Sequence, residues 1–380
     1  MVRKKERGNG SGTVYPRKNK QGKIIGYRGS YFAPDGKRRY VSAKKKGDAE
    51  RALRQAMTDA DRGLVFEAGT LTVEDYLNHW LTDSVKDTVR DTTFERYEQI
   101  TRKHIVPEVG RLKLKALSAA HVRGLYKTKL ESGLSPRTVQ YIHVTIHKAL
   151  KQAVSDGLIP RNATEAVRPP QVRKEEMRPL MPLQAKELLD AAEGDRLEVL
   201  YVLAVTTGLR QGELLGLKWE DVDLDGGALR VRRTLTTAKG GPMLSAPKTK
   251  GSRRSVKLTQ RASDALRRHL ERQLREIDTA GSHWQENGLM FASEAGEPLD
   301  RRYITTHLFK PLLKEDGLPE IRFHDLRHTC ATLLLSKNVN PKVASEMLGH
   351  ATIAITLDTY SHVLPDMQDS AVKAMEDALS

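Results

Sequence analysis

Five short segments of the 380-residue chain contain side chains that could act on an anionic centre. Arginine binds anionic oxygens through paired hydrogen bonds, histidine and lysine exchange protons, and a deprotonated tyrosine is a nucleophile. These residue types would suit phosphoryl transfer, which depends on positioning and charge stabilisation. The segments are 206–214 with Arg210, 246–254 with Lys248, 324–329 with His324 and Arg327 at i, i+3 on one predicted helix face, 348–350 with His350 at the predicted end of a helix, and 356–362 with Tyr360.

Each of these residues also has an ordinary structural interpretation. A single arginine near a helix start usually pairs with a surface carboxylate, a lysine at a predicted hairpin tip is usually solvated, and a lone helical tyrosine usually packs. His324 and His328 are spaced like metal ligands, but position 325 is Asp rather than the general-base Glu. Arg327 would also repel a cation, so no metal is expected. Taken singly, these residues do not establish a function.

As a set, the segments resemble the tyrosine recombinase (phage integrase) family in order and spacing. All six positions of the family's Arg–Lys–His–Arg–His–Tyr set carry the expected residue type. The resemblance covers nearly the whole chain and implies an enzyme of DNA strand exchange. The matching motifs are Thr-Gly-Leu-Arg-x-Gly-Glu-Leu at 207–214, the lysine at 248, His-x-Leu-Arg-His at 324–328, Leu-Gly-His at 348–350 and the tyrosine at 360.

The resemblance implies that Tyr360 attacks a scissile phosphate, leaving a 3′-phosphotyrosine and a free 5′-hydroxyl. A 5′-hydroxyl from the partner duplex then reverses the step. The phosphotyrosine conserves the bond energy, so no cofactor is expected, and the sequence has no Gly-x-x-x-x-Gly-Lys-[Ser/Thr] loop. Arg210 and Arg327 would hold the charge that develops on the non-bridging oxygens, because guanidinium groups stay protonated and donate in pairs.

Three further side chains complete the implied catalytic set. Lys248 would protonate the leaving 5′-oxygen, with its pKa depressed by neighbouring positive charges. His324 would exchange a proton with the tyrosine hydroxyl, and His350 would hydrogen-bond the phosphate. Outside the set, Glu213 is expected to orient local structure, and His328 to pack or to support its neighbours.

The elements that must position these residues begin with a basic N-terminal module. Residues 12–43 are predicted to form three strands, with turns at Gly22 and at Pro34-Asp35-Gly36, before a helix over 48–61 that Gly63 ends. Residues 1–64 contain 18 Lys and Arg against 6 Asp and Glu, a net of +12 within the chain's +16. The charges alternate with aromatic residues, which favours nucleic acid over a solubilising tail. The module resembles an arm-type DNA-binding domain.

Helical patterns follow. An apolar stripe predicts a helix over 72–81, capped by Thr70 or Thr72, and this segment resembles the start of the family's core-type DNA-binding domain. Ser135-Pro136 opens another helix, which runs to about Asp156 and ends at Gly157. The stripe consists of Val73, Tyr76, Leu77, Trp80 and Leu81.

The remaining residues predict a mixed domain with strands across 228–258. Turns are expected at Gly240-Gly241-Pro242 and Gly251-Ser252. Helices are expected over 183–193, 197–206, 211–218, 259–276 and 301–314, and from there to the end. The predicted fold class is therefore multi-domain and mainly α. Its domains are an arm-type sheet-plus-helix module (1–64), a helical core-type DNA-binding domain (65–166), an extended basic linker (167–182) and a mostly α catalytic domain with a small antiparallel sheet and a C-terminal tail (183–380).

The resemblance also implies partners. These are double-stranded DNA attachment sites of core and arm type, three further copies of the chain in a homotetramer on DNA, a DNA-bending host factor and an excisionase. Recombinases of this family exchange a C-terminal segment between neighbours. The stretch after Tyr360 is such a segment or an ordinary terminal helix folded onto its own domain, and the sequence favours neither.

Simple features of the sequence indicate the compartment. The longest apolar run, 199–205, is too short to span a bilayer, and the basic N-terminus is followed by glycines rather than an apolar signal segment. Cys330 is the only cysteine, which excludes an internal disulfide framework. We expect a cytoplasmic, nucleoid-associated protein that uses no membrane.

Other functions remain open at this point. Type IB topoisomerases and chromosome-dimer or telomere resolvases have catalytic domains that resemble this one. The arm-like N-terminal module favours an integrase over these enzymes. A non-enzymatic DNA-binding protein would explain the charge, but it gives no reason for six residues in register.

Overall fold

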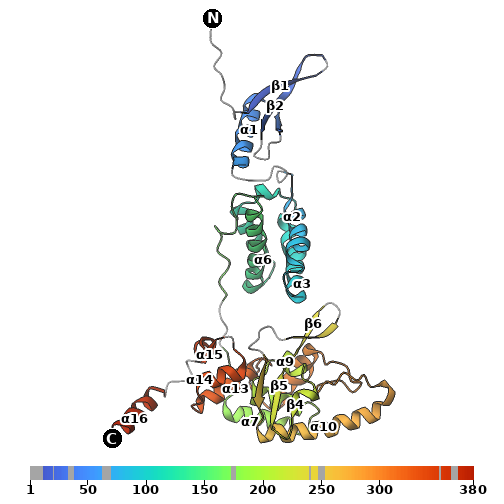
Figure 1. Ribbon diagram of the computed structural model, residues 1–380, viewed down its shortest axis with the longest axis vertical. Coiled ribbons are helices and arrows are strands. Elements are labelled where there is room, and N and C mark those ends of the chain that lie inside the picture. Colours follow the sequence, from blue (N-terminus) through green and yellow to red (C-terminus); the bar gives the residue numbers. More distant parts are fainter. Residues whose placement is uncertain are drawn as a thin grey trace. The chain divides into compact units, whose positions relative to one another are not determined.

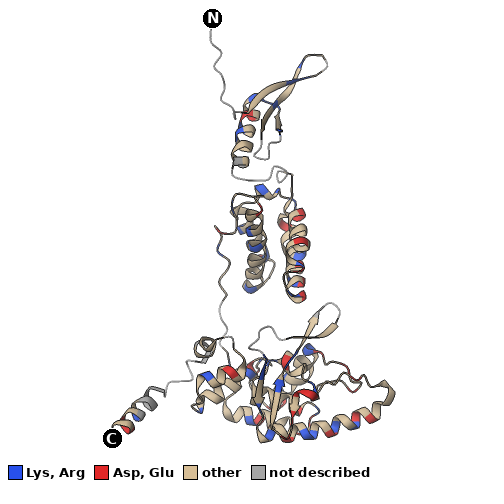
Figure 2. Ribbon diagram, viewed as in Figure 1, with Lys and Arg blue, Asp and Glu red and all other residues tan. Residues whose placement is uncertain are grey.

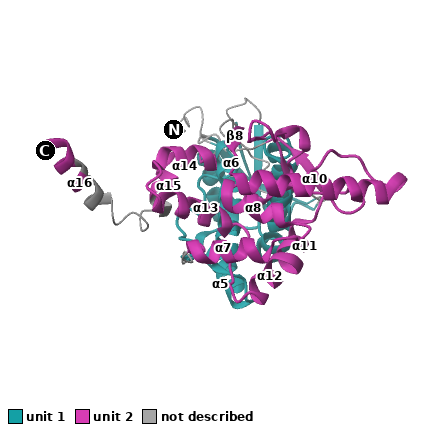
Figure 3. Ribbon diagram, turned by 90° about the horizontal axis from the view of Figure 1, so that it is seen from below, with its two compact units in different colours: residues 1–174 teal, residues 175–380 magenta. Residues whose placement is uncertain are grey.

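The computed structural model describes residues 12–19, 21–32, 38–61, 70–172, 177–238, 241–246, 253–350, 352–360 and 367–380. Packing divides the chain into two compact units, residues 1–174 and 175–380 (Figure 3). Helices dominate both units, and the sheets are small and antiparallel (Figure 1). The predicted fold class is therefore confirmed.

The N-terminal strands form one antiparallel sheet in the order β1-β2-β3, as predicted. They are β1 (Thr13–Lys18), β2 (Ile24–Phe32) and β3 (Arg38–Ala43), and α1 (Lys46–Asp61) follows. Leu53 of α1 packs with Tyr31 in the small core between helix and sheet. Gly22 has a φ of 81°, which suits its predicted turn. Phe32 pairs with Arg38, as a hairpin requires, while the turn at 34–36 and the predicted stop at Gly63 lie outside the described residues.

The helical segment of the first unit follows the predicted periodicity. Every residue of the 73–81 stripe is buried. Thr72 caps its helix reciprocally with Asp75, and the Ser135 hydroxyl accepts a hydrogen bond from the Thr138 N–H at 3.2 Å. The elements are α2 (Val73–His79), the π-helical η2 (Trp80–Val85), α3 (Asp91–Ile100), η3 (Thr101–Ile105), α4 (Val106–Val109), η4 (Leu114–Ala116), α5 (Ala119–Glu131) and α6 (Pro136–Ser155).

The second unit is built around one helix that is buried along its length. This helix, α8, lies against α7, α10 and α13 (Figure 3). It contains the apolar run 199–205, whose residues are all buried. Among the described residues, no helix is both long enough and apolar enough to cross a membrane. The helices of this unit are α7 (Pro182–Ala191), α8 (Glu198–Thr207), α9 (Gln211–Leu215), α10 (Gln260–Ala280), α11 (Arg301–Tyr303), α12 (Lys310–Glu315), α13 (Asp325–Ser336), α14 (Pro341–Leu348), α15 (Ile353–Tyr360) and α16 (Met367–Leu379).

Two small sheets flank these helices. The first has the order β4-β5-β8 and the second pairs β6 with β7. β7 and β8 belong to different sheets, so they do not pair as the two arms of the predicted basic hairpin. Its tip and the predicted turn at Gly251-Ser252 lie outside the described residues. Gly241 and Pro242, which were predicted to lie in a turn, instead pair with Ala238 and Thr237 in the second sheet, and residue 240 lies outside the described residues. The strands are β4 (Val222–Asp223), β5 (Ala228–Val231), β6 (Thr234–Ala238), β7 (Gly241–Ser245) and β8 (Arg254–Lys257).

The helix predicted over 211–218 ends at Leu215. The chain leaves the helix because its backbone pairs with a distant segment. The Met290 N–H donates to the Leu217 carbonyl at 3.0 Å, and the Trp219 N–H donates to the Gly288 carbonyl at 3.2 Å. A contact between segments so far apart in sequence overrides the local helical pattern.

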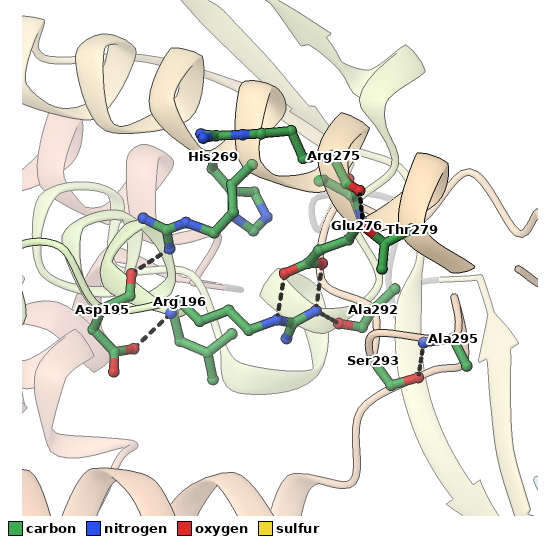
Figure 4. A network of polar contacts seen from close by, with 12 residues as sticks. Asp195, Arg196, His269, Arg275, Glu276, Thr279, Ala292, Ser293 and Ala295 are labelled. Atoms are coloured by element: carbon green, nitrogen blue, oxygen red, sulfur yellow. Dashed lines mark hydrogen bonds and ion pairs between the residues drawn. The ribbon is translucent and has the colours of Figure 1, made fainter. Parts of the chain in front are cut away.

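Ion pairs fasten α10 to the rest of the second unit. Basic and acidic residues alternate along this helix (Figure 2). Arg196, just before α8, donates to both carboxylate oxygens of Glu276 at 2.7 and 2.8 Å and to the Ala292 carbonyl at 2.8 Å (Figure 4). A bidentate, partly buried pair of this kind is stronger than an ordinary surface salt bridge. The network stabilises the core against which α8 lies.

Candidate active site

A left-handed glycine places Arg210 at the edge of the core. Gly208 ends α8 with a φ of 62°. A Cβ atom there would overlap Leu348 and lie 3.2 Å from the Cys330 sulfur, so glycine is required by both conformation and space. The chain then turns, and Arg210 becomes the N-cap of α9 with its side chain 40% exposed. The arginine can therefore reach a large ligand from a fixed backbone.

Glu213 holds Arg210 in place, as the sequence predicted. Its Oε2 accepts the Arg210 backbone N–H at 3.0 Å, and its Oε1 accepts from the Arg210 Nη1 at 2.7 Å. Arg254 donates its Nη2 to the same carboxylate at 3.0 Å. Burial opposes ionisation of Glu213, but the charge and hydrogen bond of Arg254, joined by Arg210, hold its pKa below the ordinary value. The buried carboxylate is thus ionised and satisfied by two guanidinium groups.

Arg327 lies in the first turn of α13 and is only 3% exposed. Its Nη1 donates to the Gly208 carbonyl at 2.9 Å, which ties α13 to the turn that precedes Arg210. His324 occupies the cap position before this helix rather than a helical position, so the predicted i, i+3 pair begins one residue ahead of α13. His324 is exposed at the surface, but desolvation by the surrounding protein, followed by the charge of Arg327, lowers its pKa.

His350 follows directly after the cap of α14. Gly349 takes the left-handed conformation with a φ of 68°, which ends the helix where the sequence predicted. The His350 Nδ1 lies 2.7 Å from the Thr356 hydroxyl on α15, and Thr356 is fully buried. Burial, followed by the charges of Arg327 and Arg210, lowers the pKa of His350 to about 4. The imidazole is therefore neutral at physiological pH.

The structure brings four of the six predicted residues into one electrostatic environment. The pKa values of His324 and His350 are both lowered chiefly by desolvation, and then by the charges of Arg327 and Arg210. These residues come from three places in the sequence and meet at the N-terminus of α9, the N-terminus of α13 and the C-terminus of α14. Two fixed cations beside two neutral imidazoles are suited to binding a phosphodiester.

The two remaining predicted residues are described less fully. Lys248 lies outside the described residues. Tyr360 is the last residue of α15, and only its backbone position is described. Position 360 follows Thr356 by four residues, so both positions lie on one helical face. That face includes the contact with His350.

His328 packs within the same cluster, as predicted. Its ring lies 5.2 Å from that of His324 in an edge-to-face arrangement, and burial is the main cause that lowers its pKa to about 4. No group of three or more His, Cys, Asp or Glu that could hold a metal occurs in the described part of the chain. Arg254 was not among the predicted site residues, although the alternation of β8 puts it on the buried face with Val256.

We expect acid to destabilise this cluster. The pKa values of His328 and His350 are near 4 in the folded protein and near 6.5 in the unfolded chain, so the unfolded state binds more protons between these values. The free energy of unfolding should fall as pH drops from 7 to 5, by up to about 1 kcal/mol per histidine, because solvent screens part of the effect at these half-buried groups. Urea unfolding at both pH values measures this. A His350→Gln variant should show a smaller drop than the wild type, and exposed His283→Gln an unchanged one. An equal drop in all three would contradict this prediction.

A second surface that suits an anion lies on the N-terminal sheet. Leu53 of α1 covers the face that carries Gly29 and Val41. By strand alternation, Arg28, Arg38 and Tyr40 lie on the other face. The Arg28 guanidinium lies 4.8 Å from the centre of the Tyr40 ring, and that of Arg38 lies 5.8 Å from it. This face combines cations with exposed aromatic rings, as the sequence predicted.

Family models match both units. The model described as phage integrase family matches residues 178–367, and the model described as phage integrase, N-terminal SAM-like domain matches residues 72–130. The first match includes all six predicted site residues, and the second begins at the capped helix α2.

Similar proteins span nearly the whole chain. A tyrosine recombinase XerC-like protein from Caldanaerobacter subterraneus subsp. tengcongensis is 31% identical over 359 residues, which cover 90% of this chain and 92% of the relative. An integrase from Streptomyces ambofaciens is 32% identical over 357 residues, 90% of each chain. The structure of the Tn1549 transposon integrase in complex with transposon right-end DNA matches with a TM-score of 0.68 at 23% identity, covering 82% of this chain and all of that one. The structural match shows a shared fold.

Proposed function

The chain belongs to the phage integrase family of tyrosine recombinases, and from that membership we propose how its residues cut and rejoin DNA at specific sites. It is a tyrosine-type site-specific recombinase, and its similarity to integrases identifies it as an integrase. In the proposed reaction, the oxygen of Tyr360 forms a bond to the scissile phosphorus as the bond to the 5′-oxygen breaks. A 5′-hydroxyl from the partner strand then displaces the tyrosine and restores the phosphodiester.

The proposed role of Arg210, Arg327 and His350 is to bind the phosphate. Both guanidinium groups stay protonated and can donate paired hydrogen bonds to the non-bridging oxygens as charge develops there. Their anchors support this assignment, since Glu213 fixes Arg210 and the Gly208 carbonyl fixes Arg327. Donors that are held before the substrate arrives need no reorganisation during the reaction.

Protons move through two further groups in the proposal. His324 takes the proton from the Tyr360 hydroxyl, and Lys248 gives a proton to the leaving 5′-oxygen. The lowered pKa of His324 supports the first role, because the imidazole must be neutral to accept a proton at pH 7. The position of Tyr360, one helical turn beyond the partner of His350, supports its role as nucleophile.

The observation that carries this proposal is the convergence of two arginines and two neutral histidines from distant segments. Its test is to incubate the protein, in EDTA, with DNA that flanks its own gene, and to look for an SDS-resistant protein–DNA adduct. A native gel shift run in parallel measures binding alone. An adduct formed without divalent metal supports the proposal. A clear gel shift without a covalent adduct favours the alternative that the protein binds DNA without cutting it.

We further propose that residues 1–64 bind arm-type DNA sites, residues 65–166 and 183–380 grip the core site, and 167–182 follow the backbone as a basic linker. The cationic and aromatic face of the N-terminal sheet supports the first assignment. On DNA the protein acts as a homotetramer, and a DNA-bending host factor and an excisionase assist it. Membership of the family is what supports the homotetramer, the host factor and the excisionase as partners.

Deleting residues 1–64 should separate integration from cleavage. The truncated protein should lose integration between complete attachment sites, because the second class of DNA contact is gone. It should still form the covalent adduct on an isolated core site, at a rate within about threefold of wild type, a ratio worth roughly 0.65 kcal/mol in activation free energy. Recombination in vitro and adduct formation measure the two activities. Unaffected integration would weaken the assignment as an arm-binding integrase.

A further inference from the structure

Arg254 is a buried charge inside the second unit. It opens β8, and its side chain is 7% exposed although residues 253 and 255 are exposed. The strand alternation places it beside Val256 on the face that packs into the core. A buried arginine is costly unless hydrogen bonds satisfy it, so its partners identify its role.

Two of its hydrogen bonds reach two different helices that border predicted site residues. The Nη2 donates to the Glu213 carboxylate on α9 at 3.0 Å. The Nε donates to the Met347 carbonyl, in the last turn of α14, at 2.6 Å. One guanidinium group therefore joins α9 to α14 through β8.

Each of these contacts lies next to a predicted catalytic residue. The same Glu213 carboxylate holds the Arg210 guanidinium at 2.7 Å. On the other side, the Met347 carbonyl lies three residues before His350, with Gly349 between them. A Cβ atom on Gly349 would lie 2.8 Å from the Arg254 Nη1, so this glycine leaves the room that the guanidinium occupies.

We propose that Arg254 is a positioning residue, which sets the distance between Arg210 and His350 by binding Glu213 and the end of α14 together. This inference rests on the function proposed above and adds a residue outside the family-like set of six. Arg254 itself touches no substrate in this role.

The chemistry of the side chain explains why arginine serves here. A guanidinium is planar and donates in several fixed directions, so it can bind a carboxylate and a carbonyl at once. A lysine ammonium keeps the charge but lacks this fixed fork. Without Arg254, the buried Glu213 carboxylate would lose one hydrogen-bond donor, and its hydrogen bonds to Arg210 would rearrange. Displacing a catalytic group by about 1 Å can lower a rate by about 100-fold.

The test compares Arg254→Lys and Arg254→Gln with the wild type. The readouts are the single-turnover rate of covalent adduct formation on a core site, the DNA affinity in a gel shift, and the thermal midpoint. We expect both variants to react about 10- to 100-fold more slowly, with DNA affinity within about threefold of wild type. The matched control is Arg267→Gln, which breaks an exposed arginine–carboxylate pair to Asp264 and should change none of these. A wild-type rate in folded Arg254→Gln would overturn the proposal.

A second variant covers the case in which Arg254→Gln does not fold. Glu213→Gln combined with Arg254→Met removes both charges, so no buried carboxylate is left without a partner. The proposal expects this double variant to fold and to remain slow. A folded double variant with the wild-type rate would overturn it.

A spectroscopic readout separates this inference from the proposed function. The imidazole signals of His350, followed by NMR in the free protein, should move in Arg254→Gln, because the α14 end shifts and a nearby positive charge is lost. They should stay unchanged in Arg267→Gln. If the His350 signals move in Arg254→Gln but the wild type forms no adduct, the proposed function is rejected and the positioning role of Arg254 is retained. Unmoved His350 signals would reject the positioning role, whatever the activity.

Discussion

Replacing Tyr360 with phenylalanine should abolish covalent adduct formation and recombination while DNA binding remains. The substitution removes one oxygen atom, which is the atom proposed to attack the phosphorus, and it leaves the ring in place. No other step of the proposed reaction can proceed without the phosphotyrosine. The adduct should therefore fall below detection, a loss of more than about 1,000-fold, which corresponds to over 4 kcal/mol of activation free energy. Gel electrophoresis in SDS measures the adduct, and a native gel shift measures binding.

The matched control for this substitution is Tyr303→Phe. Tyr303 is an exposed tyrosine of α11, so the control deletes the same atom away from the proposed site. It should form the adduct at the wild-type rate. An adduct that persists in Tyr360→Phe and disappears in Tyr303→Phe would show that the nucleophile has been assigned wrongly.

The second large effect is expected for Arg210→Ala. Losing one preorganised donor to a developing negative charge lowers the rate by about 100- to 1,000-fold, and Glu213 holds the Arg210 side chain in a fixed position. Its side chain is 40% exposed, so the fold should tolerate the change. Arg327 is only 3% exposed, so replacing it would also disturb the fold, and a lost rate could not be assigned to catalysis alone. The single-turnover rate of adduct formation gives the effect, and thermal unfolding tests the fold.

Two variants sharpen this second prediction. Arg210→Lys retains the positive charge but cannot donate two parallel hydrogen bonds, so it should recover only part of the rate. Arg302→Ala removes an exposed arginine of α11 and should react like the wild type. A full rate in Arg210→Ala would remove Arg210 from the phosphate-binding set.

The sequence by itself determined the elements whose signals are local. The caps at Thr72 and Ser135 and the helix end at Gly349 all depend on residues within about one helical turn, and each appears where predicted. The stripe of α2 is buried as its spacing requires. The candidate residues could also be named from their motifs, because type and spacing are properties of the chain alone.

Only the tertiary structure decided which segments meet. Arg254 looked like one of several cations in a basic stretch, yet it binds Glu213 across 41 positions and Met347 across 93. The end of α9 and the separation of β7 from β8 likewise depend on distant strand partners. Arg327 reaches the Gly208 carbonyl across 119 positions. A buried charge takes its partner from whatever the fold brings near it, and no local pattern specifies that choice.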